Sequence, residues 1–142
     1  MSVKKFVDLA IQAAKKSFSQ FKHGAVVVRR NKVLGIGNNQ LLPGNKSVHA
    51  EKDAILNSIK RWKNISGSCI YIIRIDSNGN FKISKPCLMC AKLLLKLKIS
   101  SAYYSTNDCD DCNHVPEIIT IFNVENYCTQ TNYLKRKRLH EK

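Results

Sequence analysis

Long apolar segments are missing from this chain of 142 residues. Apolar runs such as residues 25–28 and 93–95 are far shorter than the roughly 20 residues that cross a bilayer. Residues 1–6 include lysines but have neither the apolar core nor the small-residue cleavage site of a secretory signal. We therefore expect a soluble, intracellular protein with no membrane partner.

Acidic residues are also scarce. The chain has 10 Asp and Glu against 24 Lys and Arg, which gives a formal net charge of +14. Such an excess indicates an anionic partner, either a phosphorylated small molecule or a nucleic acid that binds a basic surface. Part of the charge lies in residues 135–138, so we interpret residues 135–142 as a solvated basic tail. Residues 1–134 then form one domain, because this length is too short for two ordinary domains.

A disulfide framework is not expected from the six cysteines, because disulfides persist only in oxidising compartments and no secretory signal is evident. Cys-x-x-Cys pairs in a reducing compartment indicate metal or redox chemistry. One such pair, Cys109 and Cys112, is followed by His114, and Cys128 could supply a fourth ligand. The segment is either a second zinc site or a solvent-exposed polar loop, and both interpretations stay open.

Helix and strand patterns alternate along the first 105 residues. This order predicts an α/β fold of three α-β-α layers, in which helices cover both faces of a mixed sheet of about five strands. The continuous apolar character of residues 69–75 predicts a central strand. The segment 115–133 stays open between helix and strand. The expected helices span residues 3–18, 47–61 and 86–98, and the expected strands span residues 24–29, 33–37, 69–75, 81–83 and 101–105.

Two of the expected helix starts carry residues suited to a reactive zinc site. Cys87 and Cys90 are three apart in one first turn, so both sulfurs project from one face. A helix N-terminus favours the thiolate form that zinc requires. His49 begins another helix and completes a set of three ligands, which leaves the fourth position for the water of a catalytic site. Glu51 shares a turn with His49 and is better placed to carry a proton than to bind the same ion.

His-Ala-Glu at residues 49–51, followed by Pro-Cys-x-x-Cys at residues 86–90, resembles the signature of the zinc-dependent cytidine and deoxycytidylate deaminase superfamily. The resemblance extends over residues 6–105. It implies a cytidine-deaminase-like fold, a Zn²⁺ cofactor and assembly into a homo-oligomer. It also implies hydrolysis of cytosine at C4, with water activated by zinc and protons carried by Glu51 to N3 and to the departing amine.

The resemblance assigns further roles residue by residue. His49, Cys87 and Cys90 would bind the zinc ion. The same resemblance implies two substrate contacts. Asn39, or Asn38 if the register differs by one, would form a hydrogen bond with the sugar, and the backbone N–H of Ala50 would contact the base carbonyl. His23 precedes a strand and could approach the pocket, although a loop residue without a role is the favoured interpretation.

Substrate identity is less determined than the reaction. We expect a free cytosine nucleotide or nucleoside, with a dCMP-type substrate preferred. The alternative is editing of cytosine or adenine in RNA or single-stranded DNA, where a basic surface would follow the backbone. A catalytically inactive, zinc-stabilised nucleic-acid-binding protein is the lowest-ranked hypothesis. Residues 74–83 read as a hairpin inserted near the rim of the site, which leaves the choice of substrate open.

Overall fold

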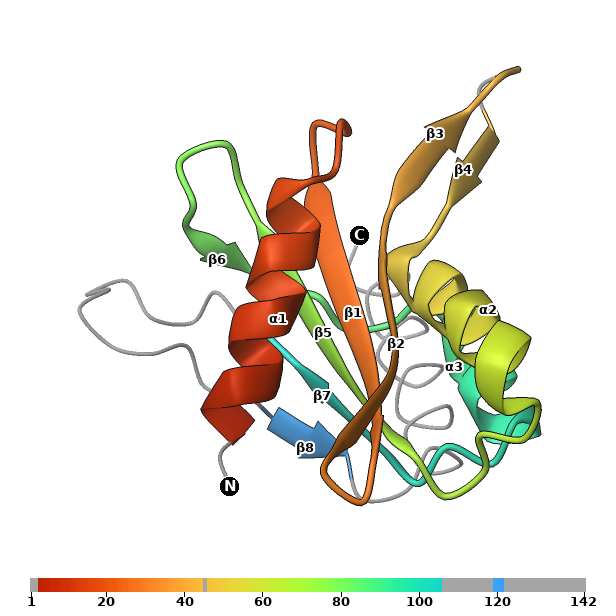
Figure 1. Ribbon diagram of the computed structural model, residues 1–142. Helices are drawn as coiled ribbons and strands as arrows, with labels where there is room; N and C mark the ends of the chain where they lie inside the picture. The colour runs from red at the N-terminus through yellow and green to blue at the C-terminus, as the bar shows by residue number, and fades with distance from the viewer. Residues whose placement is uncertain (1–2, 45, 106–118, 122–142) are drawn as a thin grey trace, which may run out of the picture.

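The computed structural model describes residues 3–44, 46–105 and 119–121 of the chain (Figure 1). Cys109, Cys112, His114 and Cys128, the ligands considered for a second zinc site, lie outside the described residues. The expected basic tail at 135–142, and with it the domain limit at residue 134, also lies outside them. Both expectations therefore stay predictions.

The sheet is mixed, with β5 at its centre. Its strand order is β2-β1-β5-β7-β8, β6 pairs with β5, and β5–β7 is the parallel pair among antiparallel ones. A separate two-stranded sheet pairs β3 with β4. The elements are α1 (Val3–Lys15), β1 (Lys22–Arg29), β2 (Lys32–Asn38), β3 (Gln40–Leu42), β4 (Lys46–Val48), α2 (Ala50–Trp62), β5 (Cys69–Ile75), β6 (Phe81–Lys82), α3 (Leu88–Lys96), β7 (Ser101–Tyr104) and β8 (Ile119–Ile121).

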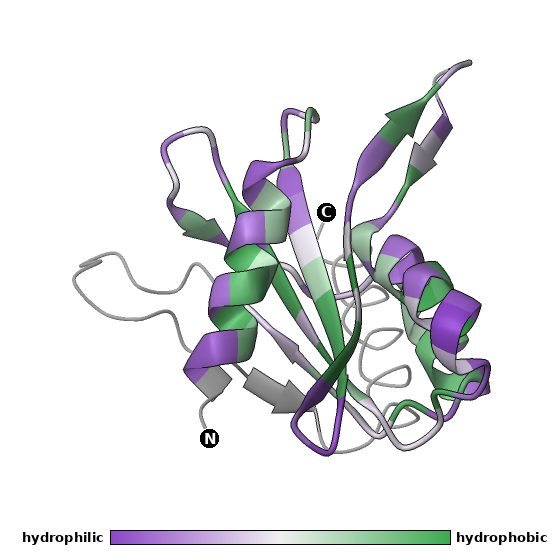
Figure 2. Cartoon of the chain, in the orientation of Figure 1, coloured by the Kyte–Doolittle hydropathy of each residue, from purple (hydrophilic) through white to green (hydrophobic). Residues whose placement is uncertain are grey.

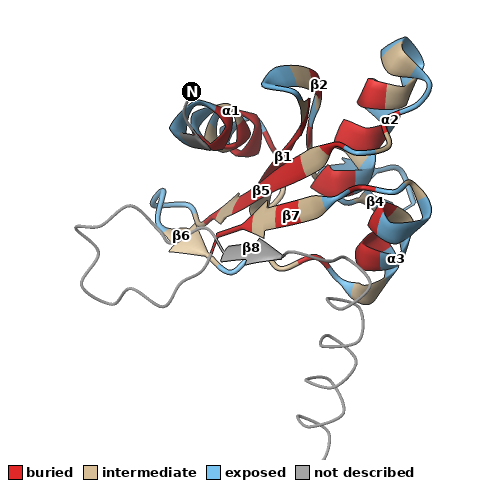
Figure 3. Ribbon diagram, turned by 90° about the horizontal axis from the view of Figure 1, so that it is seen from below, coloured by how far each residue is buried: buried red, intermediate tan, exposed pale blue. Residues whose placement is uncertain are grey.

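Three layers result, as the sequence predicts: α1 covers one face of the sheet, and α2 and α3 cover the other (Figures 1 and 3). No helix among the described residues is long and apolar enough to span a membrane.

Two hydrophobic cores lie on either side of the sheet because successive side chains of a strand point to opposite faces. The apolar stripe of α1 fills one core, and α2 and α3 fill the other, as the hydropathy colouring of Figure 2 shows. Central strands buried on both faces are continuously apolar, which explains β1 and β5. The α1 core contains Phe6, Val7, Ala10, Val26, Val28, Tyr71 and Ile73; the α2/α3 core contains Ala25, Val27, Ala54, Ile55, Ile70, Ile72, Ala91 and Leu94.

The position of α2 depends on a close approach to β2. A Cβ atom added at Gly37 would collide with the backbone nitrogen of Ala54, so a glycine is needed where the helix rests on the strand. Asn57, in the middle of α2, donates its Nδ2 to the carbonyl oxygen of Ile36 at 2.8 Å. These contacts set the helix whose first residues carry part of the site.

Several expected boundaries are wrong by a few residues. Helix α1 ends at Lys15 rather than at residue 18, and residues 40–42 and 46–48 form the β3–β4 hairpin, which was not among the expected strands. Helices α2 and α3 begin at Ala50 and Leu88, three and two residues later than expected. The reason is backbone conformation: the preceding residues have extended ψ angles of 152° and 167°, so they cap the helices from outside.

Candidate active site

The N-termini of α2 and α3 bring His49 and Cys87 together, although 37 residues separate them in the sequence. Each is the residue that caps its helix, His49 for α2 and Cys87 for α3. The Nδ1 atom of His49 lies 3.6 Å from the Sγ atom of Cys87 and 3.3 Å from that of Cys90. Cys90 is buried one turn into α3, whereas the other two residues are exposed.

These three side chains have the composition and spacing that zinc requires. Their ligand atoms all lie within 4.8 Å of one another. Ligands placed about 2.0 to 2.3 Å from a tetrahedral zinc ion are separated from each other by roughly 3.3 to 3.8 Å, which matches both measured N···S distances. The set is one imidazole and two thiols, and a set of three protein ligands is typical of catalytic zinc. His49, Cys87 and Cys90 are thus positioned to hold the metal ion.

The two thiols differ in their readiness to ionise. A hydrogen bond from the Cys90 thiol lowers the pKa of Cys87 to about 5, with help from the backbone N–H groups of Cys90 and Met89 and from the charge of His49. The pKa of Cys90 is raised, because its proton is held by Cys87 and its sulfur is buried. Cys87 therefore supplies the first thiolate for a metal ion at the start of α3.

Glu51 lies in the first turn of α2 with only 5% of its surface exposed. Burial raises the pKa of its carboxyl group, since removal from water disfavours the charged form. The side chain lines the same cavity as His49 and Cys87. A carboxyl group inside the cavity and beside the metal ligands has the placement of a proton carrier.

The cavity has a volume of about 290 Å³, near the lower end of the roughly 300–1,000 Å³ found for small-molecule sites. The starts of α2 and α3 form one wall. Strand β1 and the residue that follows β2 form another, through His23 and Asn39. Ala50, at the first position of α2, and Lys85, just before α3, also line it. The volume suits one small molecule of about nucleotide size.

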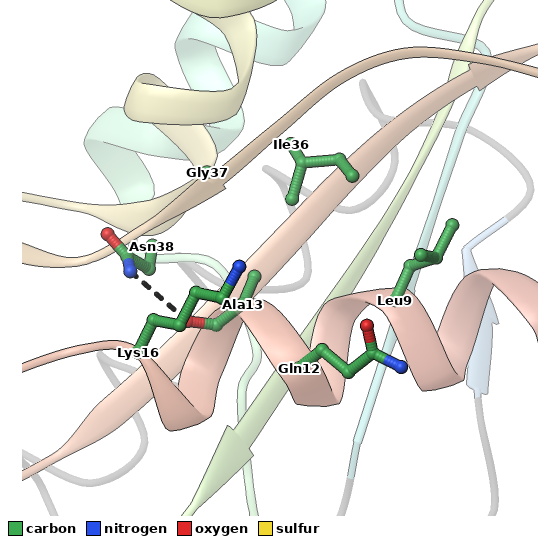
Figure 4. Close-up of a pocket in the computed structure, with 7 residues that line it drawn as sticks. All are labelled: Leu9, Gln12, Ala13, Lys16, Ile36, Gly37 and Asn38. Atoms are coloured by element: carbon green, nitrogen blue, oxygen red, sulfur yellow. Dashed lines mark hydrogen bonds between the residues drawn. The ribbon is translucent and has the colours of Figure 1, made fainter.

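Asn39 and Asn38 point to different places, since neighbouring residues of an extended chain alternate in direction. Asn39 lines the cavity; its Oδ1 accepts the N–H of His23 at 2.8 Å, and its Nδ2 donates to the Phe21 carbonyl oxygen at 2.5 Å. Asn38 instead lines a second hollow of about 210 Å³ between α1 and β2, where its Nδ2 donates to the Ala13 carbonyl oxygen at 3.1 Å (Figure 4). The structure therefore brings Asn39, and not Asn38, to the zinc ligands.

His23 is a cavity residue that the sequence interpretation did not assign to the site. It lies in β1 rather than in a loop, two residues before Ala25, and so shares the face of the sheet that α2 covers. Burial and the charge of Arg74 lower the pKa of His23 to about 4, so the imidazole stays neutral at physiological pH. Extending the expected strand 24–29 by one residue at its start would have placed His23 on this face.

Two tyrosines of the sheet pack in the hydrophobic core on the α1 side. Tyr71 is buried under α1, and its ring stacks on that of Tyr103 with centroids 4.6 Å apart. Trp62 ends α2, at the opposite end of that helix from His49, and contacts Lys32 and Arg61. None of these three rings lines the cavity.

Comparison with known proteins agrees with this geometry. A model of the family described as the cytidine and deoxycytidylate deaminase zinc-binding region matches residues 1–106. Curated protein sequences give no significant match. Among solved structures, cytidine deaminase from Burkholderia pseudomallei has a TM-score of 0.67 at 18% identity, and the alignment covers 89% of this chain and 96% of that one.

Two further structures show the range of enzymes with this fold. The dCMP deaminase of the cyanophage S-TIM5, in apo form, has a TM-score of 0.61 at 22% identity, over 78% of this chain and 90% of that one. The diaminohydroxyphosphoribosylaminopyrimidine deaminase/reductase of Thermotoga maritima has a TM-score of 0.58 at 20% identity, over 90% of this chain and 34% of that one. Such identities show the fold alone. The family match and the His-Cys-Cys cluster together place the chain in the cytidine and deoxycytidylate deaminase family, as a zinc-dependent hydrolytic deaminase.

Proposed function

We propose that this deaminase converts a cytosine nucleotide or nucleoside, with a dCMP-type substrate preferred, into the corresponding uracil compound and ammonia. The observation that carries the proposal is the buried Glu51 carboxyl group inside a cavity that also contains His49 and Cys87. A site that held zinc for structure alone would not need a carboxyl group buried at this position. This argues against the inactive, zinc-stabilised alternative.

The reaction adds water across the N3=C4 bond of cytosine and then releases the amino group on C4 as ammonia. His49, Cys87 and Cys90 would hold the zinc ion, which when bound would supply Lewis-acid activation of the water. One proton of the water ends on N3 of the product and the other leaves with ammonia, so a single group must collect and deliver both. Glu51 lies inside the cavity beside the ligands, and its carboxyl group is the proposed carrier for both transfers.

Other cavity groups would orient the substrate. The backbone N–H of Ala50 belongs to the first turn of α2, where N–H groups have no partner within the helix, and would bond the carbonyl oxygen of the base. Asn39 uses one N–H and one lone pair on residues 21–23, which leaves one of each for the sugar. Neutral His23 adds a further donor or acceptor on the opposite wall.

One observation favours a second candidate, editing of cytosine or adenine in RNA or single-stranded DNA. Phe18 is fully exposed in the loop between α1 and β1, and Phe21, which lines the cavity, is 53% exposed. Exposed aromatic rings near cationic groups stack successive bases in proteins that bind single strands. The net charge of +14 is compatible with that partner.

We also propose that the protein forms a homo-oligomer. Leu41 on the β3–β4 hairpin and Met89 at the start of α3 are large apolar side chains that are mostly exposed, and exposed apolar surface is found at interfaces between chains. Sedimentation of the zinc-loaded protein would test this. A monomer at all concentrations would contradict it.

A substrate panel tests the function. Ammonia release from dCMP, CMP, deoxycytidine, cytidine and dCTP would be compared with uracil or inosine formation in RNA and single-stranded DNA, with zinc content measured on the same sample. We expect turnover of at least one cytosine monomer, and a loss of about 10²- to 10⁴-fold in Glu51→Gln with zinc retained. Turnover on nucleic acid alone would favour editing. Full activity of Glu51→Gln would refute the proton-carrier role.

A further inference from the structure

We infer that Arg74 binds the 5′-phosphate of the substrate, so that the enzyme selects a nucleoside 5′-monophosphate over the nucleoside. The inference rests on the proposed function, whose cavity Arg74 borders, and names the group that decides its substrate class. It depends on four observations: strand register, a stacked aromatic ring, an unpartnered buried nitrogen, and the sign of the charges around the cavity.

Strand register places Arg74 next to the cavity. Arg74 of β5 is directly opposite His23 of β1 in the antiparallel pair. Directly opposite residues of such a pair have their side chains on the same face of the sheet. His23 lines the cavity, and the neighbouring Ile72 on β5 belongs to the core under α2 and α3. The side chain of Arg74 therefore continues the face on which the zinc ligands lie.

A second contact places the guanidinium group of Arg74 against a residue that lines the cavity. The Cζ atom of Arg74 lies 4.6 Å from the centroid of the Phe21 ring, and Phe21 lines the cavity. Asn39 in turn anchors the Phe21 carbonyl oxygen. A guanidinium group stacked on a ring uses its face and keeps the N–H groups at its edge for an acceptor. The arginine is thus fixed before any ligand arrives.

The edge of Arg74 has an unsatisfied donor. Its Nε atom is buried and has no hydrogen-bond partner among the described residues, whereas its backbone N–H donates to the Ser105 Oγ at 3.1 Å. Buried donors of folded proteins almost always have partners, and a guanidinium group finds its strongest ones in carboxylates and phosphates. A phosphate group presents two oxygens that match the guanidinium fork. A bound ligand would therefore supply the missing acceptor.

The charges around the cavity also favour an anion. Arg74 is a cation beside two lining residues, Phe21 and His23, and burial together with the charge of Arg74 lowers the pKa of His23 to about 4. Arg74 is therefore close enough to act on groups inside the cavity. Glu51 is the carboxyl group that lines the cavity, at its zinc end. Because the positive charge lies at β5 and the carboxyl group lies at the zinc end, we expect the phosphate to bind near β5 and the base to bind near α2 and α3.

The test compares substrates with and without a phosphate group in Arg74→Gln and Arg74→Lys, using the zinc-loaded full chain. Arg61→Gln is the matched control, because Arg61 also lies over an aromatic ring, that of Trp62, but at the far end of α2. The kcat/KM values for dCMP, deoxycytidine and a capped oligonucleotide with one cytosine would be measured. Binding of dUMP and deoxyuridine would be measured by calorimetry, which needs no turnover.

We expect the ratio of kcat/KM for dCMP to that for deoxycytidine to fall about 10- to 150-fold in Arg74→Gln, as for the loss of a hydrogen bond to a charged group. The preference for dUMP over deoxyuridine should fall equally, while Arg61→Gln leaves both ratios unchanged. Arg74→Lys should recover part of the preference, because it keeps the charge and loses the fork.

Three results would overturn the inference. The first is a wild-type protein that prefers deoxycytidine to dCMP. The second is an equal decrease of kcat/KM for dCMP and for deoxycytidine in Arg74→Gln. The third is that the capped oligonucleotide is the best substrate and that its kcat/KM does not depend on Arg74. Failure of the proposed function looks different. In that case no monomer is deaminated, yet dUMP still binds more tightly than deoxyuridine and loses this advantage in Arg74→Gln, which would support the phosphate site.

Discussion

Replacement of Asn39 by alanine tests how the cavity wall is built. The Asn39 side chain makes two hydrogen bonds to the backbone at the start of β1, to the His23 N–H and to the Phe21 carbonyl oxygen, at 2.8 and 2.5 Å. The Asn39 N–H also donates to the His23 carbonyl oxygen at 3.2 Å and survives the change. Asn39→Ala therefore removes two of the three hydrogen bonds between Asn39 and residues 21–23.

The expected cost follows from those two bonds. A protein hydrogen bond contributes about 0.5–1.5 kcal/mol net, so the free energy of unfolding should fall by about 1–3 kcal/mol. For a domain of this size that lowers Tm by roughly 3 to 15 °C. Differential scanning calorimetry in excess zinc measures Tm, and ammonia release measures activity. Activity should fall too, because Phe21 and His23 line the cavity.

Two variants complete the test. Asn39→Asp keeps the acceptor for the His23 N–H but faces the Phe21 carbonyl oxygen with a second oxygen, so it should lose more activity than stability. Asn57→Ala removes a single bond, to the Ile36 carbonyl oxygen, at a site away from the cavity, and should lower Tm without lowering activity. Asn39→Ala with wild-type Tm and no activity would refute the structural role and leave sugar binding as its only function.

Three further predictions concern the metal, the packing of α2 and the support of Arg74. Cys87→Ser should lower the zinc content, measured by atomic emission, and abolish ammonia release, because it removes one of three ligands. Gly37→Ala should cost about 1–3 kcal/mol in chemical denaturation, since its Cβ would collide with the backbone of Ala54. Ser105→Ala should lower the preference for dCMP over deoxycytidine, because the Ser105 Oγ accepts the backbone N–H of Arg74.

Each of these has a result that contradicts it. A zinc content of one per chain in Cys87→Ser would show that the ion lies elsewhere. Two zinc ions in the wild-type chain, one of them lost when Cys109 and Cys112 are replaced, would support the second metal site. Unchanged stability of Gly37→Ala would mean that α2 does not rest on β2 as described. An unchanged substrate ratio in Ser105→Ala, with lower Tm, would assign Ser105 to stability alone.

The reaction could be inferred from the sequence because the residues proposed to carry it out occur in two short segments, each at the start of one helix. His49 and Glu51 are two apart and Cys87 and Cys90 three apart, so each pair is set by the geometry of one helix start. The layers were predictable for a similar reason, because apolar periodicity within one segment distinguishes α1 from the continuously apolar β5. Such features need no knowledge of what the segment will contact.

The wall of the cavity depends on contacts between distant segments. His23 and Arg74 are 51 residues apart, and they meet because β1 and β5 pair in a particular antiparallel register. A shift of β1 by one residue against β5 would move the side chain of His23 to the α1 face, away from that of Arg74. The choice of Asn39 over Asn38 has the same origin, since the exit of β2 decides which amide faces the cavity.

The sequence by itself therefore determined the chemistry: a family motif, three zinc ligands and a carboxyl group, each positioned by short-range helix geometry. Only the tertiary structure decided what surrounds that chemistry. It made His23 a neutral cavity residue, stacked Arg74 on Phe21, and buried an arginine nitrogen without a partner among the described residues. These features arise from strand register and from desolvation by packed neighbours, which are properties of the whole fold and of no single segment.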